Sequence, residues 1–484
     1  MRALRGSFVG AMFVGIVHVA AGCGGSDELP GAGEGGAGGG GGGGGSGGDP
    51  ITCSFEVASH DVGCPGGSCP ITADVEVRCT EREFGAAGVR VAPAPTGTFL
   101  GTSSHEGTYL FEITPSGGSR FDAFPMRLDA TTMVLAQGPT GEVYAVGDET
   151  TIDGSTSPIG YPNGLVLVRP EGSGFVKETV ADRDDRYVPV HDFEIDPAGV
   201  AHVWYASDPP SGVSVAKRTV DGSFSSSAVQ TVGEGSRFTI DAAGAPVSLG
   251  FIPNGSFYDL AYGDPPEVLT GVSVPSVSTK YRVTQAPASV NGASVEPFVA
   301  VLQHDVGLHV VWPEGQASDE IEIPGTNVPS YVCPATTDYD SQNGTCPAPC
   351  HETATGIENG AFAITRTADG KVWLAWIVSH LDYMRVYEKQ CFDSDTMCIC
   401  SGVAEDVKTK NELVIARYEP GQLLVDPLFT LPIDAPAAYD LFSDLWTDVR
   451  LLDIRAFGAD VAVGVRLEDE KRVKVRVMRI LNAP

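Results

Sequence analysis

One short pattern recurs over most of this 484-residue chain: an apolar strand of four or five residues, a tight turn with glycine, and a second apolar strand. The stretches Phe193–Tyr205, around Gly199, and Phe238–Leu249, around Gly244, show it most clearly. Further copies surround the glycines at positions 141, 307, 370 and 458, and a weaker first copy surrounds position 97. No stretch of the repeats has apolar residues at helical spacing over three turns. The sequence therefore predicts an all-β fold.

The strands that follow the glycine turns are apolar on both faces. After Gly199, Ala201 and Val203 lie on one face, and His202 and Trp204 lie on the other. A strand of this kind is buried on both sides by neighbouring layers.

A more polar hairpin follows several copies, for example Val213–Val229 around Asp221-Gly222. Four strands per repeat, with buried inner strands and wetter outer strands, are typical of a β-propeller. The turn glycines lie 44, 58, 45, 63, 63 and 88 residues apart, and the shorter spacings match a blade of roughly 40–50 residues. We predict a seven-bladed β-propeller over 84–484, with cysteine-rich insertions near 326–360 and 385–410. Six or eight blades fit the spacings almost as well, and an array of β-sandwiches is the alternative fold.

One turn also resembles a known propeller element. The segment Thr367-Ala-Asp369-Gly370-Lys-Val-Trp373 is similar to the Asp-box of sialidase-type propellers, although it lacks the usual opening serine and second glycine. In that family the box is a structural turn. The resemblance therefore implies a propeller and carries no catalytic residue with it.

The first 22 residues have the pattern of an export signal. Arg2 and Arg5 precede an apolar run, Phe8–Ala21, that is too short to span a bilayer comfortably. Small residues then lead into Cys23, which resembles the lipidated cysteine of bacterial lipoproteins. An ordinary secretory signal that is cleaved nearby is the alternative.

Residues 23–49 form a glycine-rich tether, which is flexible by composition. By the same resemblance, Gly24 in place of an aspartate favours the outer membrane or the cell surface over the inner membrane. We therefore expect a lipid-anchored protein on the periplasmic or extracellular face, attached to the membrane through Cys23.

Ten further cysteines form two groups with an even number in each, which in an exported protein indicates disulfides rather than a metal site. The first group lies in a small cysteine-rich segment over 50–83, which we interpret as a collar beside the repeats. The pairing within each group stays open. The two groups are Cys53, Cys64, Cys69 and Cys79, and Cys333, Cys346, Cys350, Cys391, Cys398 and Cys400.

The net charge of −31, from 31 basic and 62 acidic residues, argues against nucleic acid as a partner, because phosphate binding needs clustered Lys and Arg. We expect a monomer. Acidic loops at Asp338–Gly344 and Asp182–Asp185 are weak calcium candidates, and we interpret them as solvated turns. No other cofactor and no metal are expected.

Propellers bind ligands where the loops that lead into the inner strands converge. Polar residues in these loops would suit a glycan or a peptide, so we predict a non-enzymatic binding module for an envelope protein or glycan. The candidate ligand-binding residues are His191, Asp192, Arg237, Glu296, Glu358, Asn359, Asp448 and Arg450.

The alternative function is a carbohydrate-active hydrolase or lyase, which needs two carboxylates that face each other across a cleft. Glu296, Glu358 and Asp448 are the candidates for such a pair. No zinc-protease, nucleotide-binding or thiol-nucleophile motif occurs at a plausible place, so the prediction names no catalytic residue.

Overall fold

The computed structural model describes strands and adjoining turns between residues 53 and 481. The described residues are 53–59, 71–79, 89–104, 107–114, 117–120, 133–151, 161–172, 174–182, 190–207, 212–241, 243–263, 265–274, 281–285, 298–304, 307–311, 319–322, 333, 346–392, 397–418, 427–433, 452–469 and 472–481. They contain 29 strands and no helix, which confirms the predicted all-β class. Hence they include no helix long and apolar enough to cross a membrane. The predicted signal, Cys23 and the tether lie outside these residues.

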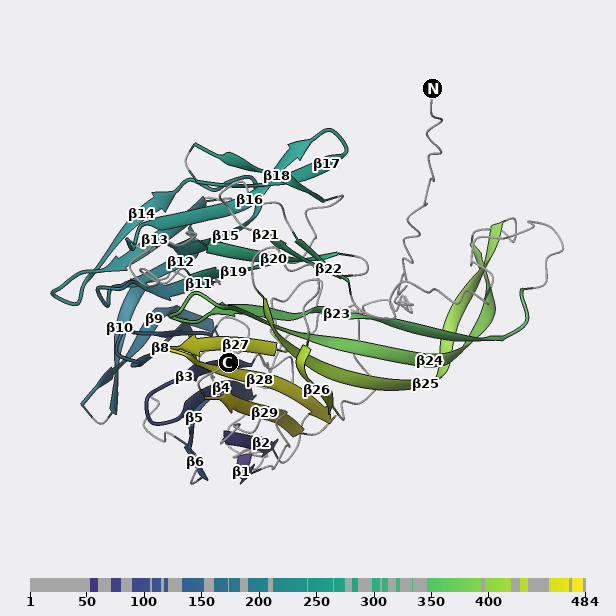
Figure 1. The fold of residues 1–484 in the computed structure, drawn as a ribbon, viewed down its shortest axis with the longest axis horizontal. Coiled ribbons are helices and arrows are strands. Elements are labelled where there is room, and N and C mark those ends of the chain that lie inside the picture. Colours follow the sequence, from purple (N-terminus) through teal and green to yellow (C-terminus); the bar gives the residue numbers. More distant parts are fainter. Residues whose placement is uncertain are drawn as a thin grey trace, which may run out of the picture. The chain divides into compact units, whose positions relative to one another are not determined.

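Seven antiparallel sheets contain all of the described strands, and six of them consist of four consecutive strands each (Figure 1). The first three of these are β3 (Arg90–Pro93), β4 (Thr98–Ser104), β5 (Gly107–Thr114), β6 (Gly117–Arg120); β7 (Val134–Gln137), β8 (Val143–Thr151), β9 (Tyr161–Glu171), β10 (Gly174–Asp182); and β11 (Val190–Ile195), β12 (Ala201–Ser207), β13 (Gly212–Arg218), β14 (Phe224–Val229). The next three are β15 (Glu234–Ile240), β16 (Pro246–Asn254), β17 (Phe257–Tyr262), β18 (Glu267–Val274); β19 (Tyr281–Gln285), β20 (Phe298–His304), β21 (Gly307–Val311), β22 (Asp319–Glu322); and β23 (Cys350–Arg366), β24 (Val372–Phe392), β25 (Met397–Tyr418), β26 (Pro427–Ile433).

The seventh sheet combines the two ends of the folded part of the chain. Its strand order is β1-β2-β29-β28-β27, from β1 (Cys53–Ser59), β2 (Ile71–Cys79), β27 (Leu452–Phe457), β28 (Asp460–Asp469) and β29 (Arg472–Ile480). The sequence predicts a small collar over 50–83 at the base of the repeats. In the structure β2 pairs with β29, so the two strands of this segment complete the last sheet.

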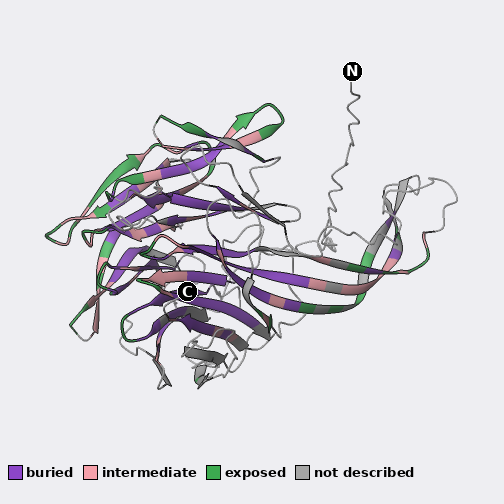
Figure 2. Cartoon of the chain, in the orientation of Figure 1, coloured by how far each residue is buried: buried purple, intermediate pink, exposed green. Residues whose placement is uncertain are grey.

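The first strands of successive sheets touch one another in a cycle. β3 contacts β7, and the contacts continue through β11, β15, β19, β23 and β27, which returns to β3. Each hydrophobic cluster joins neighbouring sheets; one, for example, combines Trp373 and Ile415 with Ile454 and Val463. The burial pattern agrees, because the first two strands of a sheet are mostly buried while β14 is largely exposed (Figure 2).

The contact between the last and first sheets is polar as well as apolar. The carboxylate of Asp453 on β27 accepts a hydrogen bond of 3.0 Å from the backbone N–H of Val91 on β3. Buried Arg479 on β29 donates to the carbonyl oxygens of Ala94, at 2.6 Å, and Gly97. Residues nearly 400 positions apart in the sequence therefore close this contact.

The repeated glycines are explained by backbone conformation and by packing. Gly141, Gly199, Gly244 and two later turn glycines have φ between 61° and 94°, which favours glycine because other L-residues are strained there. A Cβ at Gly141 would lie 2.5 Å from Pro95 of the preceding sheet's turn, and one at Gly244 would lie 3.1 Å from Asp196. The turns thus pack against each other closely.

One copy of the predicted pattern has a different place in its sheet. The turn at Gly307 joins the second and third strands, β20 and β21, rather than the first and second. The first strand of this sheet is the short β19 (Tyr281–Gln285). The single-sequence pattern missed it because residues 286–297 separate β19 from β20.

The second cysteine group lies on strand extensions rather than on loops alone. The strands β23, β24 and β25 run beyond the other sheets (Figure 1) and pair with one another along most of their length. Disulfides join Cys333 to Cys350 and Cys346 to Cys400, which confirms disulfide use in this group. Disulfides of this kind are compatible with a secreted or extracellular protein.

Candidate functional site

A cavity of about 460 Å³ lies where the first strands of six sheets come together. It is at the end at which these strands run into their turns. The lining residues come from β3, β7, β11, β19, β23 and β27 and from the turns that follow four of them. Its rim is open to solvent, since Pro139, Pro197, Ala368 and Gly458 line it and are exposed. A volume of this size is in the range of small-molecule sites.

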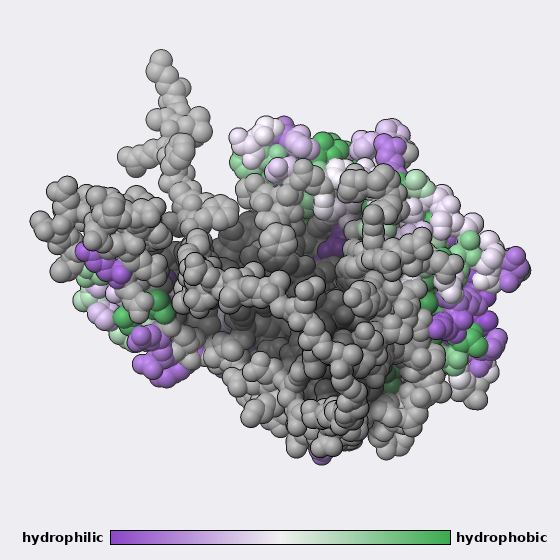
Figure 3. Space-filling view, turned by 180° about the vertical axis from the view of Figure 1, so that it is seen from behind, coloured by the Kyte–Doolittle hydropathy of each residue, from purple (hydrophilic) through white to green (hydrophobic). Residues whose placement is uncertain are grey.

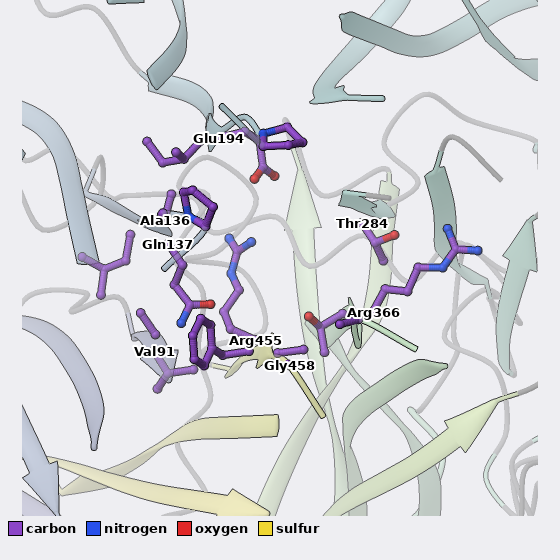
Figure 4. Close-up of a pocket in the computed structure, with 18 of the residues that line it drawn as sticks. Val91, Ala136, Gln137, Glu194, Thr284, Arg366, Arg455 and Gly458 are labelled. Atoms are coloured by element: carbon purple, nitrogen blue, oxygen red, sulfur yellow. The ribbon is translucent and has the colours of Figure 1, made fainter. Parts of the chain in front are cut away.

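Four polar side chains face the inside of this cavity from four different sheets. In Figure 4 the guanidinium of Arg455 and the carboxylate of Glu194 point toward each other, with Gln137 beside them and Thr284 across from them on the side of Arg366. The guanidinium of Arg366 points away from them, and its Nε donates to the carbonyl oxygen of Gly370 at 3.4 Å. The lining of the cavity therefore combines a carboxylate, a guanidinium and an amide on one side with a hydroxyl on the other.

Three buried polar atoms of these side chains have no hydrogen-bond partner within the described residues. They are Nε2 of Gln137, Oγ1 of Thr284 and Nε of Arg455. Thr284 is only 4% exposed. Because buried polar atoms are normally hydrogen-bonded, these atoms need water or a ligand. Two of the three are N–H donors, so the partner must offer acceptor oxygens.

Arg455 is a fixed positive charge. Burial alone would lower its pKa, but the carboxylates of Asp453, Glu194 and Asp192 outweigh that effect and raise the pKa above its ordinary value. Its Nε lies 3.7 Å from an oxygen of Asp453, too far for a hydrogen bond. The guanidinium is thus compensated in charge while its Nε still lacks an acceptor.

The second carboxylate in the lining is already engaged. Asp196 accepts hydrogen bonds of 2.9 Å from the backbone N–H groups of Ala198 and Val200 and lies 3.1 Å from Nε2 of His202. These contacts lower the pKa of Asp196 despite its burial. Asp196 therefore shapes the turn at the rim.

None of the predicted ligand-binding residues that the structure describes lines the larger cavity. Asp192 and Arg237 line a smaller cavity of about 30 Å³ deeper between the sheets. His191, Glu358 and Asn359 lie on β11 and β23, where the structure describes only their backbone. Glu296, Asp448 and Arg450 lie outside the described residues, so their part in a site stays a prediction.

The residues of the larger cavity were not among those predicted. Gln137, Glu194 and Arg455 stand at the ends of first strands, three to five positions before their turn glycines. A polar residue near the end of an otherwise apolar strand could have indicated a side chain that faces a cavity. The prediction instead placed the site in the loops that lead into these strands, which are at the opposite end of each strand from Gln137, Glu194 and Arg455.

In the part of the chain that the structure describes, no group of three or more His, Cys, Asp or Glu side chains could hold a metal ion. Of the two acidic loops, Asp182 is described at the end of β10, whereas Asp184, Asp185 and the loop at 338–344 are not. The weak calcium prediction therefore has no test here.

No protein-family model matches the sequence, and no curated protein matches it significantly. Among solved structures, a lectin of Aleuria aurantia in complex with α-methyl-L-fucoside is 10% identical, with 67% of this chain and 97% of that chain covered and a TM-score of 0.34. A puromycin hydrolase is 14% identical, with 76% and 58% covered and a TM-score of 0.34. An ulvan lyase is 12% identical, with 81% and 94% covered and a TM-score of 0.30. These similarities are too weak to assign a ligand or an activity.

Proposed function

We propose that this chain is a lipid-anchored, seven-bladed β-propeller of the cell envelope that binds a glycan in its central cavity without catalysing a reaction. The seven sheets would be the blades, and the cyclic contacts of their first strands support this arrangement. The pairing of β2 with β29 supports closure of the ring, since it joins the start of the folded chain to its end.

The single observation that carries the binding function is the set of three unpartnered polar atoms in the 460 Å³ cavity. Sugar hydroxyls both accept and donate hydrogen bonds. They would accept from Gln137 Nε2 and Arg455 Nε, and would donate to the carboxylate of Glu194. Phe457 and Pro139, which also line the cavity, offer apolar faces to the C–H surface of a sugar ring.

Binding is favoured over hydrolysis because one of the two carboxylates in the lining is held by its own turn. Asp196 accepts hydrogen bonds from backbone N–H groups and pairs with His202, so it is not placed to act as the second carboxylate of a hydrolase. A hydrolase of the usual kind needs an acid and a base or nucleophile on opposite sides of the scissile bond.

The membrane anchor rests on the sequence around Cys23. Replacing this residue, Cys23→Ser, would move the protein from the membrane fraction to the soluble fraction of fractionated cells. Continued membrane association of this variant, equal to that of the native chain, would refute the lipid anchor.

Glycan binding is tested with the mature chain in detergent micelles on an array of bacterial envelope and plant or algal oligosaccharides. We expect at least one sugar to bind, and Gln137→Leu to weaken it by roughly tenfold, since one good hydrogen bond contributes about 1–1.5 kcal/mol. Absence of any sugar ligand, with an unchanged and cooperative thermal unfolding profile, would refute the glycan function.

A further inference from the structure

The 460 Å³ cavity narrows on the side away from its rim, and the residues at that level form its floor. Glu194, Val283, Ile364 and Arg455 line both the 460 Å³ cavity and the 30 Å³ cavity below it, so the two spaces adjoin across these residues. The lower space has room for about one or two water molecules, and a hexose is many times larger than a water molecule. The wide space therefore narrows sharply at the level of these four residues.

The narrow part is packed with charged side chains of both signs. Three carboxylates and three guanidiniums line it: Asp192, Glu194, Asp453, Arg237, Arg282 and Arg455. The numbers of positive and negative groups are equal, which suits a buried cluster because uncompensated charges are expensive to bury.

Several of these groups are held in place by contacts with neighbouring strands. Asp192 accepts a hydrogen bond of 2.9 Å from the backbone N–H of Phe238, and Asp453 accepts one of 3.0 Å from Val91. The guanidinium of Arg282, which is 7% exposed, lies 5.5 Å from the centre of the Phe362 ring. Moving these groups apart would break contacts between three pairs of sheets, so the floor resists opening.

From this geometry we propose, on the basis of the glycan function above, that the site binds only the terminal sugar of a glycan chain, inserted end-on from the rim. A chain interior has one sugar on each side of the bound unit and needs a groove that is open at both ends. Within the described residues, the cavity instead opens at a rim of turn residues and narrows on the opposite side to the 30 Å³ space, which is lined by charged groups.

The charges of the cavity also define the kind of sugar. Arg455 is already compensated by Asp453, Glu194 and Asp192, and Arg366 points away from the centre. No excess of positive charge faces the ligand, while Glu194 would repel an acidic group. The terminal sugar is therefore neutral, bound through its hydroxyls by Gln137, Thr284, Glu194 and Arg455.

The test uses calorimetry with the mature chain and neutral sugars in three forms. Glucose, galactose, mannose, rhamnose and N-acetylglucosamine are measured as methyl glycosides and as linear oligosaccharides, and cyclic α-glucan and cyclic β-glucan represent chains without ends. We expect the bound methyl glycoside and its linear chain to differ in affinity by less than about threefold. Cyclic glucans should bind at least tenfold more weakly than linear ones when glucose is the ligand.

If affinity rises steadily with chain length, or if a cyclic glucan binds as well as its linear form, end-on recognition is wrong although glycan binding stands. If glucuronic or galacturonic acid binds more tightly than the neutral sugars, the assignment of a neutral ligand is wrong. If no sugar binds in any form, the glycan function itself fails.

A matched pair of variants locates the site. Thr284→Val removes a buried, unpartnered hydroxyl in the cavity and should weaken sugar binding by roughly tenfold. Thr239→Val removes a hydroxyl on β15 that is also buried and unpartnered within the described residues but lines neither cavity, and should leave binding unchanged. Equal effects of the two substitutions would place the ligand elsewhere. The thermal unfolding midpoint of each variant shows whether the fold is intact.

Discussion

At the scale of single residues, Asp196 and His202 connect the rim of the cavity to the core. His202 is 1% exposed, donates from Nε2 to Asp196, and has an Nδ1 without a partner in the described residues. Burial lowers the pKa of His202 below its ordinary value of 6.5, although Asp196 opposes the shift. Because its pKa is lowered, the imidazole is neutral at pH 7 and pairs with Asp196 through Nε2.

This pair predicts a loss of stability on mild acidification. Below pH 6.5 the unfolded chain protonates this histidine while the folded chain does not, so the unfolded state gains protons and is favoured. The free energy of unfolding should fall by up to about 1.4 kcal/mol per pH unit until the folded pKa is reached. Urea unfolding of the native chain and of His202→Gln between pH 7.5 and 5 tests this, and the variant should show the shallower dependence. Parallel slopes would contradict the assignment.

At the scale of elements, the turns need glycine for two reasons, a positive φ and a lack of space for a Cβ atom, and the sequence alone does not distinguish them. Gly141 and Gly199 both have positive φ, 94° and 81°. A Cβ at Gly141 would meet Pro95 at 2.5 Å and Phe457 at 2.8 Å, whereas a Cβ at Gly199 would have Pro139 at 4.0 Å as its nearest neighbour. The turn at Gly199 thus needs glycine only for its backbone conformation, whereas the turn at Gly141 also needs it because a Cβ atom has no space there.

A pair of alanine substitutions measures the difference. Gly199→Ala should cost about 1–2 kcal/mol, the strain of a left-handed conformation. Gly141→Ala should cost roughly 1–3 kcal/mol more, because it overpacks the contact between turns. Chemical denaturation of both variants gives the two values. Equal losses would mean that the turn contact relaxes freely.

The register of the strands also predicts disulfide pairs that the cysteine spacing left open. Cys53 lies opposite Cys79 in the β1–β2 pair, and Cys391 lies opposite Cys398 in the β24–β25 pair. Directly opposite residues of antiparallel strands are within reach of a disulfide after small adjustments. Mass spectrometry of unreduced peptides should find these two pairs and, by elimination, Cys64 with Cys69. A link between Cys53 and Cys64 or Cys69 would contradict the register.

At the scale of the whole molecule, the seventh sheet contains strands from both ends of the described chain, so we expect its stability to depend on both. The strand β29 pairs with β28 on one side and with β2 on the other. Without β2, one edge of β29 would expose its backbone N–H and C=O groups, which promotes association with other chains.

Two truncations test this dependence. A chain that begins at residue 51 keeps β1 and β2, and we expect it to unfold at the same temperature as the mature chain. A chain that begins at residue 81 lacks both strands and should unfold roughly 5–10 °C lower, and should form oligomers in sedimentation experiments. If the shorter chain stays monomeric with an unchanged unfolding midpoint, these strands do not stabilise the last sheet.

Local sequence patterns determined the strands and most of the turns. Alternation, apolar runs and turn glycines depend on neighbours within a few residues, so Gly199, Gly244 and the Asp221-Gly222 hairpin were read correctly. The same reasoning identified the hairpin of β20 and β21 but missed β19, which residues 286–297 separate from β20. The long extensions of β23–β25 were interpreted as insertions because a strand that continues past its sheet has no separate local signal.

The sequence by itself determined the all-β class, the recurring hairpins and the use of disulfides, because each depends on residue type and short spacing. Only the tertiary structure decided that β1 and β2 belong to the last sheet and that Gln137, Glu194, Thr284 and Arg455 face one cavity. Viewed from behind, the described part of the surface shows hydrophilic and hydrophobic residues interspersed (Figure 3). The reason is physical: strands far apart in the chain meet through backbone pairing and core packing, and those contacts depend on the whole chain.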